Sequence, residues 1–437
     1  MQVLIVGSGG REHALAWGVS RSPRLGKLYA YPGNAGIAQI AEIPPLPGDE
    51  IGTLADFAKG AGIDLTIVGP EVPLDHGIVD EFRRRDLVIF GPTKDAARLE
   101  TSKAFAKELM IASGVPTAEY GVFDDFNAAW RYASNHRLPL VVKADGLAGG
   151  KGALICETPA KLEKALNAML HKGTFGRAGS TVVIEEFMEG EEASLFVLAD
   201  GNGGTTILGS AQDYKRVGEG DTGPNTGGMG ACSPLSSLGA AAVDGVMETI
   251  VHPVLKAVAE AGHPYTGMLY VGLMLTKDGP KVVEFNCRFG DPESQVIIPR
   301  IADDLLMLLY ASATGYLPVD RVNLTAKNAV CVIMASGGYP GNYETGKPIT
   351  GIGEDDFASV VFHAGTTLKE GQLVTNGGRV LGVTGMGATV RAATFNAYRR
   401  AESIHFEDAY LRTDIAWREL ERLNGDKTEN GKKKRRR

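Results

Sequence analysis

Cysteine is scarce in this 437-residue chain, and long apolar runs are missing. Its four cysteines are too widely spaced for a disulfide framework or a zinc finger, so we expect small buried hydrophobic residues at Cys156, Cys232, Cys287 and Cys331. No apolar run approaches the roughly 18 residues of a membrane span. The first residues lead directly into a strand, without a basic segment or a cleavage site. We therefore expect a cytoplasmic protein with no membrane partner.

Positive charge is also scarce outside the last residues of the chain. The formal net charge of the chain is −7. Residues 424–437 alone have a net charge of +5, so the rest of the chain has a net charge of −12. Because an acidic surface repels phosphate backbones, we expect no nucleic-acid partner. The basic tail has the composition of a disordered segment, and a role in binding some other anionic partner stays open.

The length and the strand pattern indicate a multidomain α/β protein. Domains usually hold roughly 100 to 200 residues, which predicts about three units. Apolar strands at residues 2–6, 28–30 and 65–68 each end in a glycine-containing loop and alternate with helical segments. This alternation is typical of parallel β-α units, whose ligands collect at the carboxyl ends of the strands.

Two familiar nucleotide motifs are absent. The dinucleotide fingerprint G-x-G-x-x-G is changed to Gly7-x-Gly9-x-x-Glu12, and no acidic residue ends the second strand, which argues against NAD. The strand at 139–143 runs into a glycine-rich loop flanked by Lys143 and Lys151, which is no Walker A loop because Gly152 follows Lys151. Such a loop lets backbone N–H groups approach phosphate oxygens. A tight turn without a ligand remains the alternative for each loop.

The segment at residues 282–293 carries the strongest chemical signal. Strand periodicity predicts that Glu284, Asn286 and Arg288 share one face, while Val283, Phe285 and Cys287 point the other way. Carboxylate and amide oxygens suit Mg²⁺ or Mn²⁺ beside nucleotide phosphates. A guanidinium on the same face can neutralise a transferring phosphoryl group. The alternative is a half-exposed strand with an ordinary Glu–Arg pair.

Two further segments have features of a nucleotide site and of a functional loop. After a strand at 181–184, Glu185, Glu186 and Glu192 can accept hydrogen bonds from an adenine amino group and ribose hydroxyls, whereas Glu189 and Glu191 suit a solvated face. Residues 221–230 are rich in Gly, Pro and Asn, which predicts a long surface loop. Strands near 329–334 and 380–383 suggest a small α/β cap.

Taken together, these segments resemble the phosphoribosylamine–glycine ligase family of ATP-grasp enzymes. The resemblance spans residues 1 to about 423 and rests on seven ordered segments, at 7–14, 32–36, 67–71, 143–148, 221–230, 284–293 and 375–380. Tyr214, where some relatives carry His, and Gly149, where Ala is common, are small departures that remove no charged group.

The resemblance implies an α/β multidomain ATP-grasp fold. A parallel-sheet domain of the Rossmann-like, pre-ATP-grasp type is expected at 1–101, and an ATP-grasp domain at 102–326, with a lid at about 120–190 and a metal-bearing part at 191–326. A C-terminal α/β domain at 327–423 and the basic tail at 424–437 complete the expected order.

It also implies that the chain joins glycine to 5-phosphoribosylamine, consuming ATP and forming glycyl phosphate on the way, in purine biosynthesis. The implied ATP-binding residues are Lys103, Lys143, Gly146, Gly150, Lys151, Glu185, Glu186, Phe187 and Glu192. Glu284 and Asn286 are the implied ligands of Mg²⁺ or Mn²⁺. The implied catalytic residues are Arg288 and Lys215 for the phosphoryl group and Asp213 for the glycine ammonium. The implied phosphoribosylamine side comprises Gly9, Gly10, Asn34, Glu71 and Arg379, with Arg288 near it.

Other functions stay open from the sequence. His13 could face the phosphoribosylamine pocket or be a packed histidine at a helix start, and no general base is evident. Rival functions are a carboxylase-type ATP-grasp enzyme that uses bicarbonate and a nucleotide-binding regulator without turnover. The expected partners are small molecules only, and a monomer is expected.

Overall fold

The chain begins with a parallel sheet covered by helices. The computed structural model describes residues 1–149 and 152–423. Its first sheet has the strand order β2-β1-β3-β4, formed by β1 (Gln2–Gly7), β2 (Lys27–Pro32), β3 (Leu65–Val68) and β4 (Ile89–Phe90). The helices of this unit are α1 (Gly10–Ser20), α2 (Ile51–Gly60), α3 (Glu71–Asp75) and α4 (Ile78–Arg84). All its strand pairs are parallel, so the three predicted glycine loops lie at one edge of the sheet.

The glycine loop after β1 explains the missing dinucleotide fingerprint. Gly9 caps α1, and its backbone N–H donates to the Glu12 carboxylate over 2.5 Å. A helix N-terminus in a dinucleotide-binding domain offers those donors to a pyrophosphate. Here the buried Glu12 carboxylate accepts a hydrogen bond from one of these donors.

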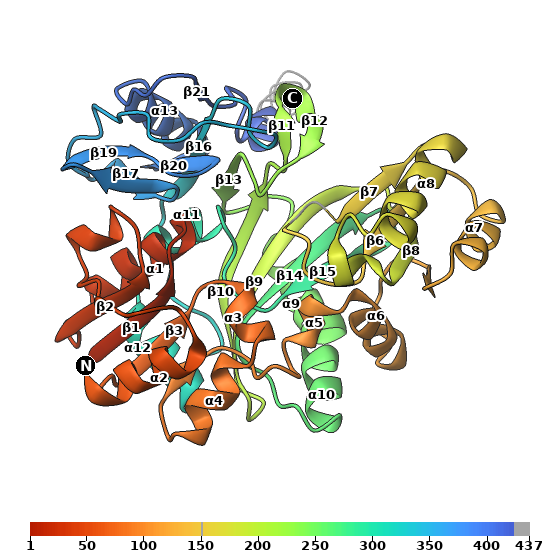
Figure 1. Ribbon diagram of the computed structural model, residues 1–437, viewed down its shortest axis with the longest axis horizontal. Helices are drawn as coiled ribbons and strands as arrows, with labels where there is room; N and C mark the ends of the chain where they lie inside the picture. Colours follow the sequence, from red (N-terminus) through yellow and green to blue (C-terminus); the bar gives the residue numbers. More distant parts are fainter. Residues whose placement is uncertain (150–151, 424–437) are drawn as a thin grey trace, which may run out of the picture.

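The lid is a separate antiparallel sheet. Two short helices, α5 (Arg98–Thr101) and α6 (Lys103–Ala112), lead from the first unit to it, and Ser102 caps α6 by accepting the Phe105 N–H. The lid strands follow the order β5-β8-β6-β7, with β5 (Tyr120–Phe123), β6 (Leu140–Ala144), β7 (Ala153–Cys156) and β8 (Val182–Glu186). Helices α7 (Phe126–Ser134) and α8 (Pro159–Leu166) lie on this sheet, which projects to the right in Figure 1.

A long sheet forms the centre of the molecule and continues into the C-terminal part. Its strands follow the order β15-β14-β9-β10-β13-β16-β20-β17, with β21 beside β16. The strands before residue 327 are β9 (Glu191–Asp200), β10 (Thr205–Asp213), β13 (Gly230–Ser233), β14 (Thr266–Thr276) and β15 (Gly279–Asn286). Those after it are β16 (Asn328–Ser336), β17 (Ser359–His363), β20 (Arg379–Gly387) and β21 (Ala409–Tyr410). The pairing of β13 with β16 joins the two parts.

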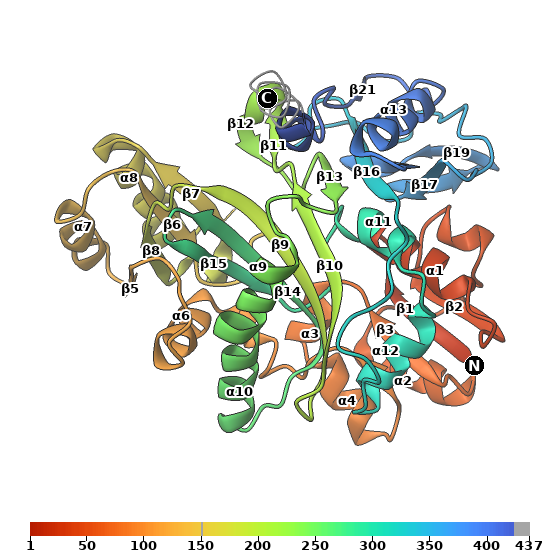
Figure 2. The ribbon, with the colours of Figure 1, turned by 180° about the vertical axis from the view of Figure 1, so that it is seen from behind.

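Helices cover this sheet on both sides, as Figures 1 and 2 show. They are α9 (Ala240–Val246), α10 (His252–Glu260), α11 (Ser294–Ile297), α12 (Leu305–Ala313) and α13 (Val390–Ala401). The hydrophobic core of the first unit is continuous with that of the central sheet. One cluster of buried residues includes Val6 from the first unit and Leu195 and Val282 from the central sheet. The lid has its own core, around Val142, Leu166 and Ile184.

Several expectations can be compared with this architecture. All four cysteines are free and buried, as expected. The predicted surface loop at 221–230 is wrong in part, because β12 (Thr222–Asn225) pairs with β11 (Arg216–Gly218) in a hairpin. A second hairpin, β18 (Thr366–Lys369) with β19 (Gln372–Thr375), lies in the C-terminal part. Among the described residues, every helix is too short or too polar to cross a bilayer. The basic tail lies outside the described residues.

Candidate active site

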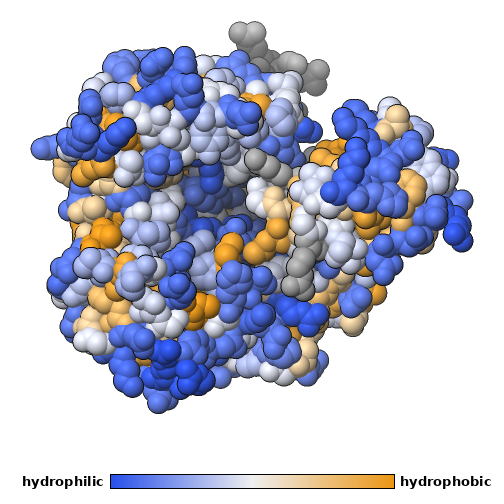
Figure 3. All heavy atoms as spheres, viewed as in Figure 1, coloured by the Kyte–Doolittle hydropathy of each residue, from blue (hydrophilic) through white to orange (hydrophobic). Residues whose placement is uncertain are grey.

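A cavity of about 910 Å³ opens between the lid, the central sheet, the N-terminal unit and the C-terminal part. Each contributes wall residues, among them Arg11, Lys143, Glu284 and Arg379. Figure 3 shows the molecule hollowed here, with hydrophilic residues in the depth of the hollow and both hydrophilic and hydrophobic residues around it. Polar side chains from four units therefore meet in one enclosed space.

The strand β15 presents its polar residues to this cavity, with one departure from simple alternation. Phe285 and Cys287 are buried in the core, as predicted, and Glu284, Asn286 and Arg288 line the cavity. The prediction for Val283 is wrong: it lines the cavity and is only half-buried. The reason is a bulge, because the register with β14 pairs Gly272 with Glu284 and then Leu273 with Val282. Val282 therefore packs in the core.

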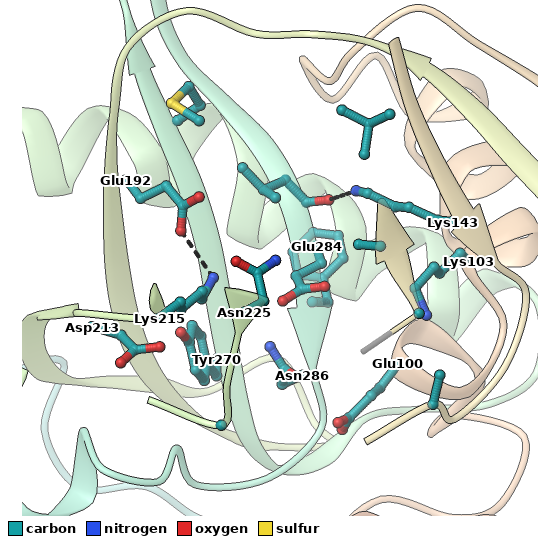
Figure 4. Close-up of a pocket in the computed structure, with 18 of the residues that line it drawn as sticks. Glu100, Lys103, Lys143, Glu192, Asp213, Lys215, Asn225, Tyr270, Glu284 and Asn286 are labelled. Carbon is teal, nitrogen blue, oxygen red and sulfur yellow. Dashed lines mark hydrogen bonds and ion pairs between the residues drawn. The ribbon is translucent and has the colours of Figure 1, made fainter. Parts of the chain in front are cut away.

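The Glu284 carboxylate lies free among cations. Within the described residues it forms no hydrogen bond or ion pair, although Figure 4 shows Lys215 on one side of it and Lys103 and Lys143 on the other. Burial alone would raise the pKa of this carboxyl, but Lys215, Lys143 and Lys103 together lower it. The carboxylate is therefore ionised and available to a ligand.

These donors fit a divalent cation that also binds phosphates. No group of three His, Cys, Asp or Glu residues in the described chain is placed to hold a metal ion. Glu284 and Asn286 offer two oxygen ligands in the cavity wall. Two protein ligands are enough for Mg²⁺, which commonly takes its other ligands from water and substrate phosphates. The nearby lysines supply the positive charge that such phosphates need.

Arg288 is held by acidic residues from two earlier segments. Its Nε donates to Glu71 over 3.2 Å, and its Nη2 lies 3.0 Å from Glu100 and donates to Asn286 Oδ1 over 3.1 Å. Glu100 also accepts the Cys287 N–H over 2.6 Å. Burial raises the pKa of Glu100, although Arg288 opposes that rise. Sequence reasoning missed Glu100, because it lies in an unremarkable stretch before α6.

The lid brings its lysine to the central strand. Lys143 Nζ lies 2.8 Å from Glu185 and donates to the Val283 carbonyl over 3.0 Å. Lys107, which no sequence motif indicated, lies 3.2 Å from the same carboxylate. Burial lowers the pKa of Lys107 to about 8. Glu185 Oε1 still lacks a well-aligned hydrogen bond, so an acceptor for a ligand donor remains.

The other residues selected for nucleotide binding are placed unevenly. Lys103 donates to the Gly146 carbonyl over 3.1 Å, and both residues line the cavity. Phe187 is a cavity residue, and Glu192 lies 2.9 Å from Lys215. Glu186 also lines the cavity, but it accepts the Glu119 N–H and pairs with Lys281. Gly150 and Lys151 lie outside the described residues.

Asp213 is the cavity carboxylate most strongly affected by its surroundings. Burial, together with the neighbouring Glu293, raises its pKa well above the ordinary range. Its Oδ1 is buried without a hydrogen-bond partner among the described residues. The pKa of Lys215 is also raised. Burial lowers it, but Glu192 and other acidic neighbours more than offset that effect. A small cation would find an unsatisfied acceptor at Asp213.

The predicted phosphoribosylamine residues divide into two sets. Glu71 and Arg379 line the cavity, and Arg379 Nη2 lies 3.2 Å from Asp291. Gly9, Gly10 and Asn34 are absent from its wall as far as the structure describes it. Asn34 holds its own loop, because its amide donates to the Ser8 and His363 carbonyls and accepts two backbone N–H groups.

His13 is a packed residue. Its Nδ1 accepts the His363 backbone N–H over 2.8 Å, and its ring contacts Phe362 edge-on. Burial, with His363 nearby, lowers its pKa to about 3. Of the two interpretations left open by the sequence, the geometry favours the packed histidine.

The C-terminal segment secures the hairpin that borders the cavity. Asp221 pairs with Arg412 over 2.9 Å and also with Arg418, which itself lines the cavity. The Tyr410 hydroxyl donates to the Val217 carbonyl over 2.7 Å. Asn225, the last residue of β12, reaches the cavity (Figure 4). No motif indicated these contacts, because they join residues almost 200 positions apart.

Comparisons with known proteins agree along the whole described chain. Three sequence models match in order: "Phosphoribosylglycinamide synthetase, N domain" at 1–100, its "ATP-grasp (A) domain" at 101–294 and its "C domain" at 329–418. A phosphoribosylamine–glycine ligase of Rhizobium meliloti (strain 1021) is 48% identical over 424 residues, 97% of this chain and 99% of that protein. One from Pseudomonas aeruginosa is 48% identical over 98% of this chain and 100% of its own.

Solved structures agree as well. The crystal structure of a Thermotoga maritima phosphoribosylamine–glycine ligase has a TM-score of 0.83 and 35% sequence identity, covering 95% of this chain and 100% of its own. A biotin carboxylase of Campylobacter jejuni has a TM-score of 0.74 at 17% identity, covering 94% of this chain and 92% of its own. That second likeness shows a shared fold and nothing more.

Proposed function

This chain belongs to the phosphoribosylglycinamide synthetase family, and from that premise we propose that it ligates glycine to 5-phosphoribosylamine. The products are glycinamide ribonucleotide, ADP and phosphate, and the reaction is a step of purine biosynthesis. The expected ATP-grasp fold with an N-terminal parallel sheet is confirmed. The enzyme uses ATP and a divalent cation, and we propose Mg²⁺ or Mn²⁺ as that cation. We further propose a cytoplasmic monomer.

The chemistry follows from the poor reactivity of a carboxylate. Glycine cannot acylate an amine directly, so its carboxylate first takes the γ-phosphoryl group of ATP and becomes glycyl phosphate. The amine of phosphoribosylamine then displaces phosphate. Catalysis of such transfers depends mainly on positioning and on charge stabilisation. A divalent cation held by Glu284 and Asn286 would supply part of that charge.

The cavity provides groups for each task. Lys103, Lys143 and the loop from Gly146 onward would hold the ATP phosphates, and Glu185, Phe187 and Glu192 would hold adenosine. Glu284 and Asn286 would bind the cation, while Lys215 and Arg288 would neutralise the transferred group. Asp213 would receive the glycine ammonium. Glu71 and Arg379 would face phosphoribosylamine. We also propose the unit boundaries expected from the sequence, 1–101, 102–326 and 327–423.

The unpaired Glu284 carboxylate among lysines is the structural observation that carries this assignment. A carboxylate that is ionised but not paired is suited to a cation that arrives with a polyphosphate. A regulator without turnover has no need for such an arrangement. The carboxylase alternative has only fold similarity behind it, since its structural relative is 17% identical.

A phosphate-release assay tests the function. Purified enzyme is given MgATP, glycine and freshly made phosphoribosylamine, and each is omitted in turn. We expect ADP and glycinamide ribonucleotide in equal amounts only when all three are present. Bicarbonate in place of glycine should release no phosphate. ATP turnover that depends on bicarbonate, or nucleotide binding without turnover on any substrate, would reject the proposal.

A further inference from the structure

The carboxylates around the cavity differ in whether a cation neutralises them. Most of those in its wall form an ion pair. Among the described carboxylates of this cavity wall, the only ones without an ion pair are Glu189, Asp213, Glu284 and Glu293. Glu189 is exposed to solvent. A carboxylate without an ion pair is free to contact a bound ligand, so the three enclosed ones are the candidates for contact with substrates.

Two of these three already have a use. Glu284 suits the divalent cation, and Asp213 suits the glycine ammonium. Glu293 has no part in the reaction as assigned so far, although it lines the same cavity and is only 3% exposed. A buried carboxylate without an ion pair is costly to keep, which indicates that it has a purpose.

Glu293 is oriented by hydrogen bonds from neutral groups. The Tyr270 hydroxyl donates to its Oε1 over 2.6 Å, and the Ser194 hydroxyl donates to the Tyr270 oxygen over 2.9 Å. The absence of a side chain at Gly290 leaves room for the Glu293 carboxylate, which a Cβ there would displace. The carboxylate is thus fixed in place without being neutralised.

Glu293 lies in the same cavity wall as the groups proposed for both halves of the chemistry. Burial is the largest cause of the raised pKa of Asp213 and of Tyr270, and the charge of Glu293 is the next. The same charge also raises the pKa of Arg288 and of Arg379. Asp213 is the proposed glycine site, Arg288 the phosphoryl site and Arg379 the phosphoribosylamine site. Glu293 therefore faces the cavity in which both steps are proposed to take place.

The second step requires a proton acceptor. When the amine nitrogen of phosphoribosylamine bonds to the carbonyl carbon of glycyl phosphate, the carbon–oxygen bond to phosphate breaks and its electron pair leaves on phosphate. The nitrogen must then lose one proton to become an amide. We propose, building on the proposed function, that the Glu293 carboxylate accepts this proton and that Tyr270 orients it. The proton passes to solvent when the product leaves.

The paired carboxylates are weaker candidates for this role. Burial raises the proton affinity of Glu71 and Asp291, but Arg288 and Arg379 more than offset it, so that the pKa of each lies below its ordinary value. A general base works best with a pKa near the working pH, which disfavours both. Asp213 is occupied by the ammonium while the amine attacks.

Glu293→Gln separates the two steps. The amide keeps the shape and can still accept from Tyr270, but it cannot take a proton. Rapid quench with all three substrates should give one equivalent of ADP at the wild-type rate, followed by ligation at least about 100-fold slower, the lower range for a general base. Hydroxylamine, whose adduct loses its proton readily, should form glycyl hydroxamate from MgATP and glycine as fast as with the wild type.

Glu189→Gln is the matched control, because it removes an unpaired but exposed carboxylate of the same wall. It should leave every rate unchanged. Loss of the ADP burst together with ligation would assign Glu293 to phosphoryl transfer or to folding, and unchanged ligation would remove it from the mechanism. Either result overturns the proposal. If the wild type itself makes no glycinamide ribonucleotide, the proposed function fails instead.

Discussion

At the scale of single residues, Glu284 gives the most direct test of the cavity. Glu284→Gln keeps its size but deletes the charge that would face the divalent cation. Turnover should fall by two orders of magnitude or more, since a metal contributes several kcal/mol of transition-state stabilisation. The apparent Mg²⁺ requirement should rise at the same time. Steady-state rates over a Mg²⁺ titration measure both effects.

The control for Glu284 lies two residues away on the same strand. Val282 is fully buried in the core, so Val282→Thr should lower the free energy of unfolding by about 1–3 kcal/mol through a buried hydroxyl. Its turnover should be nearly normal. If Val282→Thr damages catalysis while Glu284→Gln does not, the metal site lies elsewhere.

Asp213 predicts how glycine use depends on pH. Because burial and Glu293 raise its pKa, its carboxyl becomes protonated at a higher pH than an ordinary aspartate. A protonated carboxyl cannot pair with an ammonium, so kcat/KM for glycine should fall as the pH falls through that raised pKa. Asp213→Asn should lower kcat/KM for glycine by about 10- to 100-fold, the range for a charged hydrogen bond. The variant should also lose this pH dependence.

The KM for ATP provides the control for this aspartate, and it should be the same in the wild type and in Asp213→Asn at each pH. A glycine profile that keeps its pH dependence in the variant would show that another group binds the ammonium.

At the scale of elements, Lys143 connects the lid with strand β15. Lys143 is buried and contacts both Glu185 and the Val283 carbonyl. Lys143→Met should raise the KM for ATP about 10- to 100-fold, because a charged hydrogen bond is worth roughly 1.5–3 kcal/mol. Lys164→Met, which alters an exposed lysine of α8, is the matched control. Equal KM values in the two variants would exclude Lys143 from the nucleotide site.

The hairpin β11–β12 depends on the C-terminal segment. Arg412, which is fully buried, and Arg418 both pair with Asp221. Asp221→Asn should lower the free energy of unfolding by about 2 kcal/mol, since it leaves a buried guanidinium partly uncompensated. It should also reduce kcat/KM several-fold, because Asn225 at the end of β12 lines the cavity. Denaturant unfolding and steady-state kinetics measure these changes.

Asp244→Asn is the control for that element, because its pair with Arg321 lies at the surface and is worth little. An Asp221→Asn enzyme that matches this control in stability and rate would show that the C-terminal segment does not position the hairpin.

The elements also show where sequence reasoning works. Strands β1, β3 and β15 could be predicted because their apolar runs and loops carry strong local signals. The bulge at Val283 could not, since it depends on the register between β14 and β15, which pairs Gly272 with Glu284 and Leu273 with Val282. The same holds for Glu100 and Arg412, whose partners lie far away in the chain. Short-range patterns identify the reactive groups, whereas the residues that orient them depend on tertiary contacts.

At the scale of the whole molecule, the contact between the N-terminal unit and β17 should make stability sensitive to acid. His13 and His363 lie against each other there, and burial lowers the pKa of His13 to about 3 and of His363 to about 4. Both histidines take up protons on unfolding below about pH 6.5, so the folded state loses stability as the pH falls from there. Each tenfold difference in proton affinity is worth about 1.4 kcal/mol.

His363→Gln isolates this effect, because glutamine keeps polar atoms but does not titrate in this range. Between pH 6.5 and 5, where ordinary carboxyls are still ionised, the free energy of unfolding of the wild type should fall more steeply than that of the variant. Denaturant titrations at several pH values give both slopes. His405→Gln removes an exposed histidine and should follow the wild type. If His363→Gln also follows the wild type, the buried histidine pair does not control how the free energy of unfolding responds to acid.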